Sequence, residues 1–168
     1  MNSEQPVLLE VSHVTKAFKE VMALNDLSFQ VSRGVVHAVV GEAGAGKTTL
    51  MKILGGFVRA GDFAGEVLLE GEPLKLRSPA DALRARIAIV PRKVALMENC
   101  SVADNIVLGS WQVRRSFWVS READNARSLA LLHDWSIDID LAAPVQNLTA
   151  LQRRLLMIAR GLAVNPKL

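Results

Sequence analysis

The sequence predicts an α/β protein in which a sheet-rich first part precedes a helical second part. Three observations lead to this expectation. Apolar and β-branched runs fill the first ninety residues, a glycine-rich loop joins one such run to a helical segment, and the later residues carry apolar positions at helical spacing. The chain has 168 residues and is 50% hydrophobic, which is sufficient for a globular core.

Three early runs predict strands: VLLEVSHV from Val7, LSFQVS from Leu27 and VVHAVVG from Val35. The third run leads directly into the glycine-rich loop. The next segment, KTTLMKIL, predicts a helix closed by Gly55 and Gly56, because glycine readily takes the left-handed conformation that ends helices. The order strand, glycine loop, helix is therefore expected near residue 45.

After this helix, GEVLLEGEPL resembles a hairpin, SPADALRAR a short helix, and IAIV from Ile87 a buried strand. Helices are then expected around 102–108, 122–133 and 150–163, and Asn165 and Pro166 should end the last one. In this last helix, apolar residues recur at spacings of three and four, which predicts one face packed on a core. They are Leu148, Leu151, Leu155, Ile158, Ala159 and Leu162.

Residues 41 to 50 read GEAGAGKTTL, and they satisfy the pattern GxxxxGK(S/T) through Gly41, Gly46, Lys47 and Thr48. In such a loop, backbone N–H groups surround phosphate oxygens and the following helix directs its positive dipole end toward them. Gly44 adds further backbone freedom. We expect Lys47 to lie by the β and γ phosphates and the Thr48 hydroxyl to bind Mg²⁺. The alternative without a binding role is a glycine-rich turn that happens to precede a helix. The predicted strand VVHAVVG before the loop and the predicted helix after it disfavour this alternative.

Composition excludes several other functions. The net charge is +3, from 20 basic and 17 acidic residues spread along the chain, which does not indicate a nucleic-acid partner. A single cysteine, Cys100, excludes an intrachain disulfide, and the three histidines share no metal-ligand spacing with it. No apolar run approaches the roughly 18 residues that span a bilayer, so we expect any membrane role to go through a partner.

With the loop in place, the surrounding residues resemble the nucleotide-binding domain of an ABC transporter over essentially the whole chain. The segments that carry the resemblance are VTKAFKEVMALNDLSFQV, SPADALRARIAIVP, SVADNIVLG and LTALQRRLLMIARGLAVNPKL. The second and third are especially similar to importers of simple sugars of the ribose, galactose and xylose type. The resemblance implies an α/β P-loop NTPase fold of ABC type, with a mixed sheet and an antiparallel β subdomain at 1–91. A helical subdomain with a degenerate signature segment follows at 92–168.

The resemblance also implies ligands, partners and a location. The expected cofactors are ATP and Mg²⁺, with Phe18 stacked on adenine, although an ordinary core phenylalanine is the alternative. Expected partners are a second nucleotide-binding domain, transmembrane permease subunits and, indirectly, a periplasmic or extracellular solute-binding protein, but no nucleic acid. The expected location is the cytoplasmic face of the membrane, as a peripheral subunit. The implied nucleotide-binding residues are Phe18, Gly41, Gly44, Gly46, Lys47, Thr48 and Thr49, with Thr48 as the Mg²⁺ ligand.

Several positions depart from the family pattern. Arg92 stands where the family has a glutamine that contacts Mg²⁺, and a guanidinium cannot ligate a cation. The signature LSGGQ is replaced by LTALQ, in which Ala150 and Leu151 add side chains where close backbone approach is needed. The chain ends at Leu168, before the expected Walker B aspartate, the catalytic glutamate and the histidine. No catalytic residue is therefore assigned, and little hydrolysis is expected from this chain alone.

The resemblance places the missing Walker B strand beside the run that ends at Val40. We therefore expect an unpaired apolar edge and a chain that is marginally stable or prone to aggregation. The expected function is an ATP-binding subunit of an importer for simple sugars, which couples ATP binding and hydrolysis to transport. The alternative is a nucleotide-binding but catalytically degenerate regulatory half of an ABC ATPase dimer. A soluble ABC protein of translation or DNA repair is disfavoured by the importer-like segments.

Overall fold

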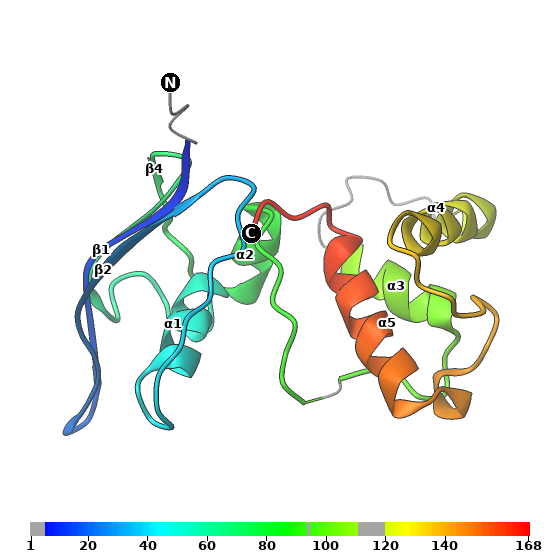
Figure 1. Cartoon of the computed structure of the whole chain (residues 1–168), viewed down its shortest axis with the longest axis horizontal. Helices are drawn as coiled ribbons and strands as arrows, with labels where there is room; N and C mark the ends of the chain where they lie inside the picture. Colours follow the sequence, from blue (N-terminus) through cyan, green and yellow to red (C-terminus); the bar gives the residue numbers. More distant parts are fainter. Residues whose placement is uncertain (1–5, 94, 111–119) are drawn as a thin grey trace. The chain divides into compact units, whose positions relative to one another are not determined.

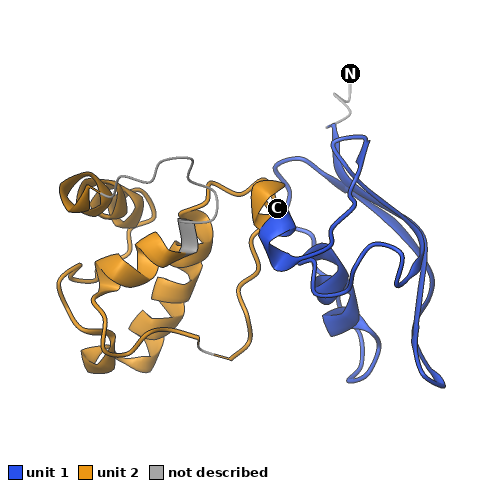
Figure 2. Ribbon diagram, turned by 180° about the vertical axis from the view of Figure 1, so that it is seen from behind, with its two compact units in different colours: residues 1–82 blue, residues 83–168 orange. Residues whose placement is uncertain are grey.

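The computed structural model describes residues 6–93, 95–110 and 120–168. The chain divides into two compact units, shown in different colours in Figure 2: unit 1 is Met1–Ala82 and unit 2 is Leu83–Leu168. The domain boundary implied by the family resemblance, after residue 91, stays a prediction.

Unit 1 contains a four-stranded antiparallel sheet in the order β2-β1-β3-β4 (Figure 1). Its strands are β1 (Val7–Phe18), β2 (Val21–Ser32), β3 (Ala64–Leu69) and β4 (Glu72–Pro73). The two predicted early strands and the predicted hairpin are confirmed. Strands β1 and β2 are longer than expected and meet in a tight turn, where Phe18 pairs with Val21.

Helix α1 (Lys47–Leu54) packs its apolar side into unit 1, where Leu50, Ile53 and Leu54 are buried. The helix begins and ends as predicted. The amide of Gly55 donates to the carbonyl of Met51, and Gly56 has a φ of 71°. A Cβ on Gly56 would lie 2.3 Å from the carbonyl oxygen of Ser78, so glycine is required there. Helix α2 (Pro79–Arg84) begins directly after Ser78 and confirms the predicted short helix.

The predicted strand from Val35 to Val40 is wrong, because no described residue forms a ladder with this run. The run has no regular secondary structure, Val36 is fully exposed and Val40 is 87% exposed. The ring of His37 stacks on Phe29 of β2, with centroids 5.3 Å apart. A β-branched composition favours a strand, but a strand also requires a partner for its N–H and C=O groups.

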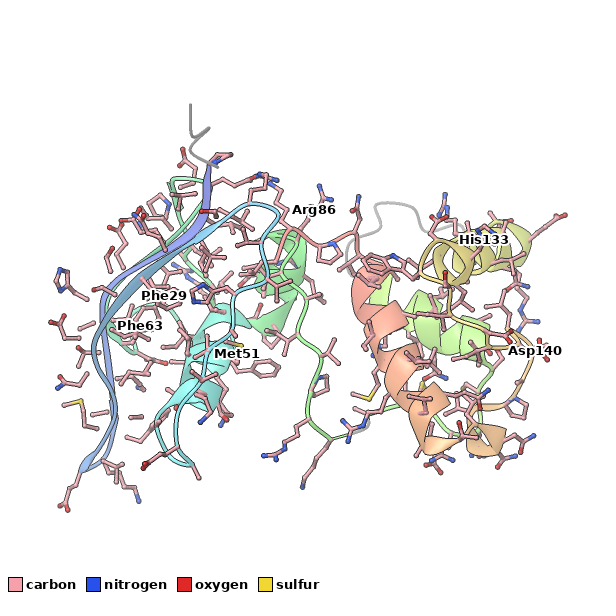
Figure 3. The ribbon with its side chains drawn as sticks, viewed as in Figure 1. Phe29, Met51, Phe63, Arg86, His133 and Asp140 are labelled. Atoms are coloured by element: carbon pink, nitrogen blue, oxygen red, sulfur yellow. The ribbon has the colours of Figure 1, made fainter. Side chains whose placement is uncertain are left out.

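The predicted strand from Ile87 to Val90 is also wrong. Ile87 is buried, but the only backbone bond found for this run within the described residues is from the amide of Ala88 to the carbonyl of Leu168. Arg86, labelled in Figure 3, reinforces this contact because its Nε donates to the carbonyl of Asn165 at 2.7 Å. The expected mixed sheet is therefore absent from the described residues, and the sheet that forms is antiparallel throughout.

Unit 2 is helical and contains α3 (Val102–Ser110), α4 (Arg121–Asp134) and α5 (Ala150–Leu162). A short 3₁₀ turn, η2 (Val145–Asn147), lies between α4 and α5. The three predicted helices are confirmed. Helices α3 and α5 lie side by side in Figure 1. Their shared core is apolar and consists of Val102, Ile106, Leu132, Ile139, Val145, Leu148, Leu156 and Ala159. No helix in the described part of the chain is both long enough and apolar enough to cross a bilayer.

Polar side chains cap the helices of unit 2. The hydroxyl of Ser101 donates to the Asp104 carboxylate at 2.6 Å and accepts from the amide of Asp104, which closes the start of α3. The hydrogen bond from the Ser101 side chain is the main cause that holds the pKa of Asp104 below its ordinary value. Ser120 accepts from the amide of Ala123 and caps α4 in the same way.

The predicted apolar stripe of α5 is partly wrong. Leu148 and Ala159 are buried as expected, but Leu151 is 68% exposed and Ile158 is also exposed. The buried residues within the helix are Leu156, Met157 and Ala159. The helix carries apolar residues on more than one face, and spacing alone does not reveal which face meets the core.

We predict that Val36→Lys will reduce self-association of the chain, whereas Val21→Lys will have a smaller effect. Both valines are exposed, but Val21 lies in a paired strand, and Val36 lies in an apolar run whose backbone has no ladder partner among the described residues. Light scattering against protein concentration measures the difference. Equal effects of the two substitutions would contradict the assignment of the aggregation-prone segment.

Candidate functional site

The glycine-rich loop connects the run that ends at Val40 to α1 and is shaped by glycines at positive φ. Gly44 has a φ of 89° and Gly46 a φ of 84°, which other residues rarely adopt. Gly46 stands immediately before the first residue of α1, as its N-terminal cap. The loop therefore turns in a left-handed step directly into the helix, and its glycines are needed where the backbone reverses.

Gly46 is also required because the loop packs tightly on β2. A Cβ at Gly46 would lie 2.1 Å from the carbonyl oxygen of Ala23 and 2.7 Å from the side chain of Leu24. By contrast, a Cβ on Gly44 would meet nothing within 4 Å. The two glycines share a backbone conformation, but only Gly46 has a neighbour at this distance. The start of α1 is thus fixed against the β1–β2 hairpin.

Backbone donors gather at the start of α1. Within the described residues, the amides of Gly44, Gly46, Lys47 and Thr48 donate to no carbonyl or side chain. The first turn of α1 carries no acidic side chain that would compete for these donors. An α-helix has partial positive charge at this end, so the group of amides suits an anion with several oxygens.

The side chain of Lys47 folds back over the loop. Its ammonium donates to the carbonyl oxygens of Gly41 and Glu42, each at 2.6 Å. These two bonds hold the positive charge beside the same turn that presents the free amides. Thr48 is exposed and Thr49 is half-buried on the first turn of α1. The loop and the start of α1 therefore bring together six of the sequence-predicted residues: Gly41, Gly44, Gly46, Lys47, Thr48 and Thr49.

Phe18 lies at the end of β1 and is 45% exposed, so the alternative of an ordinary core phenylalanine is not supported. The ammonium of Lys16 lies 4.8 Å from the centroid of its ring. Sequence reasoning missed Lys16. The signal that would have found it is the spacing of two residues on a strand, which puts both side chains on the same face.

The signature segment and Arg92, where the sequence departs from the family pattern, take structural roles in unit 2. Thr149 and Gln152 form a capping box at the start of α5, in which the Thr149 hydroxyl accepts from the Gln152 amide and the Gln152 side chain accepts from the Thr149 amide. Leu151 is exposed and is not the core residue that the spacing suggested. The carbonyl of Arg92 accepts from Arg154 of α5 at 2.9 Å, and the Arg92 side chain is exposed.

Comparison with known proteins decides the family. The family model described as ABC transporter matches residues 24–168, which includes the glycine-rich loop and all of unit 2. The chain belongs to the ABC transporter family. The family resemblance predicted from the motifs is thereby confirmed.

Similar proteins support this placement. The chain is 35% identical over 164 residues to the xylose import ATP-binding protein XylG of Geobacillus kaustophilus, covering 98% of this chain and 32% of that protein. It is 35% identical over 162 residues to the ribose import ATP-binding protein RbsA of Hahella chejuensis, covering 96% of this chain and 32% of that protein. The chain spans about a third of the length of these curated relatives.

Solved structures of ABC transporter cassettes share the fold. The crystal structure of a nucleotide-free ATP-binding cassette from an ABC transporter matches this chain with a TM-score of 0.81 and 24% identity. The match covers 95% of this chain and 66% of that one. An ADP conformation of an ATP-binding cassette has a TM-score of 0.78 at 24% identity, with 96% of this chain and 66% of that chain aligned. The expected α/β class of the ABC cassettes is confirmed, although the two predicted strands are not formed.

We predict that Gly46→Ala will destabilise the chain more than Gly44→Ala. Both variants place a Cβ at positive φ, which costs roughly 1–2 kcal/mol. Only Gly46→Ala also forces a Cβ against the Ala23 carbonyl, and overpacking of this kind adds about 1–3 kcal/mol. Urea unfolding followed by circular dichroism measures both variants. Equal losses of unfolding free energy would show that the loop does not pack on β2 as described.

Proposed function

We propose that this chain is the ATP-binding part of an ABC importer for simple sugars, and that it couples ATP binding and hydrolysis to transport. One observation carries the proposal: the group of free amides at the start of α1, beside the Lys47 ammonium, in a chain of the ABC transporter family. The sugar class is supported by relatives named as xylose and ribose import ATP-binding proteins. These names also favour an import subunit over a catalytically degenerate regulatory half.

In this proposal the triphosphate is bound mainly by backbone groups. The amides of Gly44, Gly46, Lys47 and Thr48 donate to phosphate oxygens, and Gly41 and Thr49 complete the cradle. Lys47 exchanges part of its bonding to the Gly41 and Glu42 carbonyls for the β and γ phosphates. Since these donors are held by α1 and by the contact with β2, little reorganisation is needed before binding.

Thr48 is proposed as a ligand of Mg²⁺ that accompanies the nucleotide. Thr48 is exposed on the first turn of α1, and its hydroxyl is the kind of oxygen ligand that a hard cation prefers. Mg²⁺ held there would neutralise part of the charge on the β and γ phosphates. The side chain of Arg92 supplies no ligand, since a guanidinium offers only donors.

The proposed partners follow from the family. A second nucleotide-binding domain would face the loop across the nucleotide, and permease subunits would hold both domains at the cytoplasmic face of the membrane. A solute-binding protein outside the membrane would act indirectly, and nucleic acid is not a proposed partner. Catalytic residues are not assigned to this chain in the proposal.

We predict that Lys47→Ala will weaken ATP binding by at least about tenfold, because a charged hydrogen bond to phosphate contributes about 1.5–3 kcal/mol. Titration with a fluorescent ATP analogue measures the change. Lys52→Ala is the matched control, since Lys52 is an exposed lysine at the other end of the same helix. ATP affinity that is unchanged in Lys47→Ala, or reduced to the same degree in both variants, would refute the phosphate cradle.

We predict that Thr48→Val will weaken ATP binding in Mg²⁺ but leave binding in EDTA unchanged, because valine keeps the shape of threonine and lacks its oxygen. Thr48→Ser retains the hydroxyl and should bind Mg²⁺-ATP with nearly the affinity of the unmodified chain. Titrations with and without Mg²⁺ make the comparison. A loss of the same size in EDTA would assign Thr48 to the nucleotide and not to the metal.

A further inference from the structure

Lys16 has two contacts that fix its ammonium in place. The group lies 4.8 Å from the centroid of the Phe18 ring, which is within the distance of about 6 Å for attraction between a cation and an aromatic face. It also donates to the carbonyl oxygen of Asp62 at 2.5 Å. Lys16 and Phe18 are two residues apart on β1, so their side chains leave the strand on the same face. The lysine therefore bridges Phe18 and the segment that leads into β3.

The same lysine is close in the fold to the phosphate loop. On the hairpin, Lys16 pairs with Leu24. The carbonyl oxygen of Ala23 and the side chain of Leu24 are the groups that a Cβ on Gly46 would meet first. All of these residues belong to unit 1. One short series of contacts thus joins the ammonium, the aromatic ring and the start of α1.

We propose that Lys16 is a positioning residue, which holds the Phe18 ring for stacking with the base of the nucleotide. This proposal rests on the proposed function, in which Phe18 contacts adenine. The ammonium attracts one face of the ring, and the 45% exposure of Phe18 leaves surface for a flat base. An unrestrained ring loses rotamer freedom when a base stacks on it, and this loss costs binding free energy. Because Lys16 already restrains the Phe18 ring, the entropy cost of stacking is smaller.

The test compares two ligands, ATP and inorganic tripolyphosphate, because only ATP has a base. Lys16→Met removes the charge and keeps a long apolar side chain. We expect it to weaken ATP binding by about two- to fivefold, the size of an exposed cation–π contact, and to leave tripolyphosphate binding unchanged. Retained tripolyphosphate binding also shows that the loop is folded. Lys16→Arg keeps a cation over the ring and should restore most of the ATP affinity.

Two further variants separate positioning from a general effect of charge or folding. Lys19→Met removes an exposed lysine from the same hairpin turn and should change neither affinity. In a Phe18→Leu background, Lys16→Met should have no further effect on ATP, because the lysine acts through the ring. An effect that persists without Phe18, an equal loss for both ligands, or tighter ATP binding by Lys16→Met would overturn the proposal.

Failure of this inference is distinguishable from failure of the proposed function. If Lys47→Ala loses both ATP and tripolyphosphate while Lys16→Met binds both normally, the phosphate cradle stands and Lys16 has no role in base stacking. If Lys47→Ala binds both ligands normally, the proposed function itself is refuted, and with it the role of Lys16.

Discussion

The close approach of the Gly46 backbone to the Ala23 carbonyl is the constraint on which the rest of the candidate site depends. There is room at this point for a hydrogen atom but not for a side chain, so the end of the loop is fixed against β2. This contact sets where α1 begins and therefore where its free amides gather. Because β2 is paired with β1, the same contact also determines how far the loop lies from Phe18.

Each part of unit 1 contributes a different kind of interaction. The loop and the start of α1 supply rigid backbone donors, Lys47 supplies a charge held by two loop carbonyls, and the hairpin supplies an exposed aromatic ring. The ammonium groups of Lys47 and Lys16 both donate to carbonyl oxygens, so neither half-buried charge lacks a hydrogen-bond partner. The arrangement is suited to a ligand that is anionic at one end and flat at the other.

Unit 2 shows that the signature segment forms a capped helix start although Ala150 and Leu151 stand where the family signature has glycines. Thr149 and Gln152 satisfy each other in the capping box of α5, so the helix start is stable without the glycines of the usual signature. Arg154 and Arg160 of α5 donate to the carbonyls of Arg92 and Ala95. The position where the family has glutamine is therefore tied to α5 through its backbone, whatever its side chain.

The sequence by itself determined the helices, the two early strands, the hairpin of β3 and β4 and the glycine loop, since these depend on local spacing, caps and backbone freedom. It also indicated Phe18 through the family resemblance. Only the tertiary structure decided that Val35 to Val40 stays unpaired among the described residues, that α5 exposes Leu151, and that Lys16 lies over Phe18. The reason is physical: strand pairing and the choice of buried face each require a partner distant in sequence, which composition and periodicity do not encode. The two-residue spacing puts Lys16 and Phe18 on one face of β1, but the position of the ammonium over the ring also depends on its bond to the distant Asp62 carbonyl.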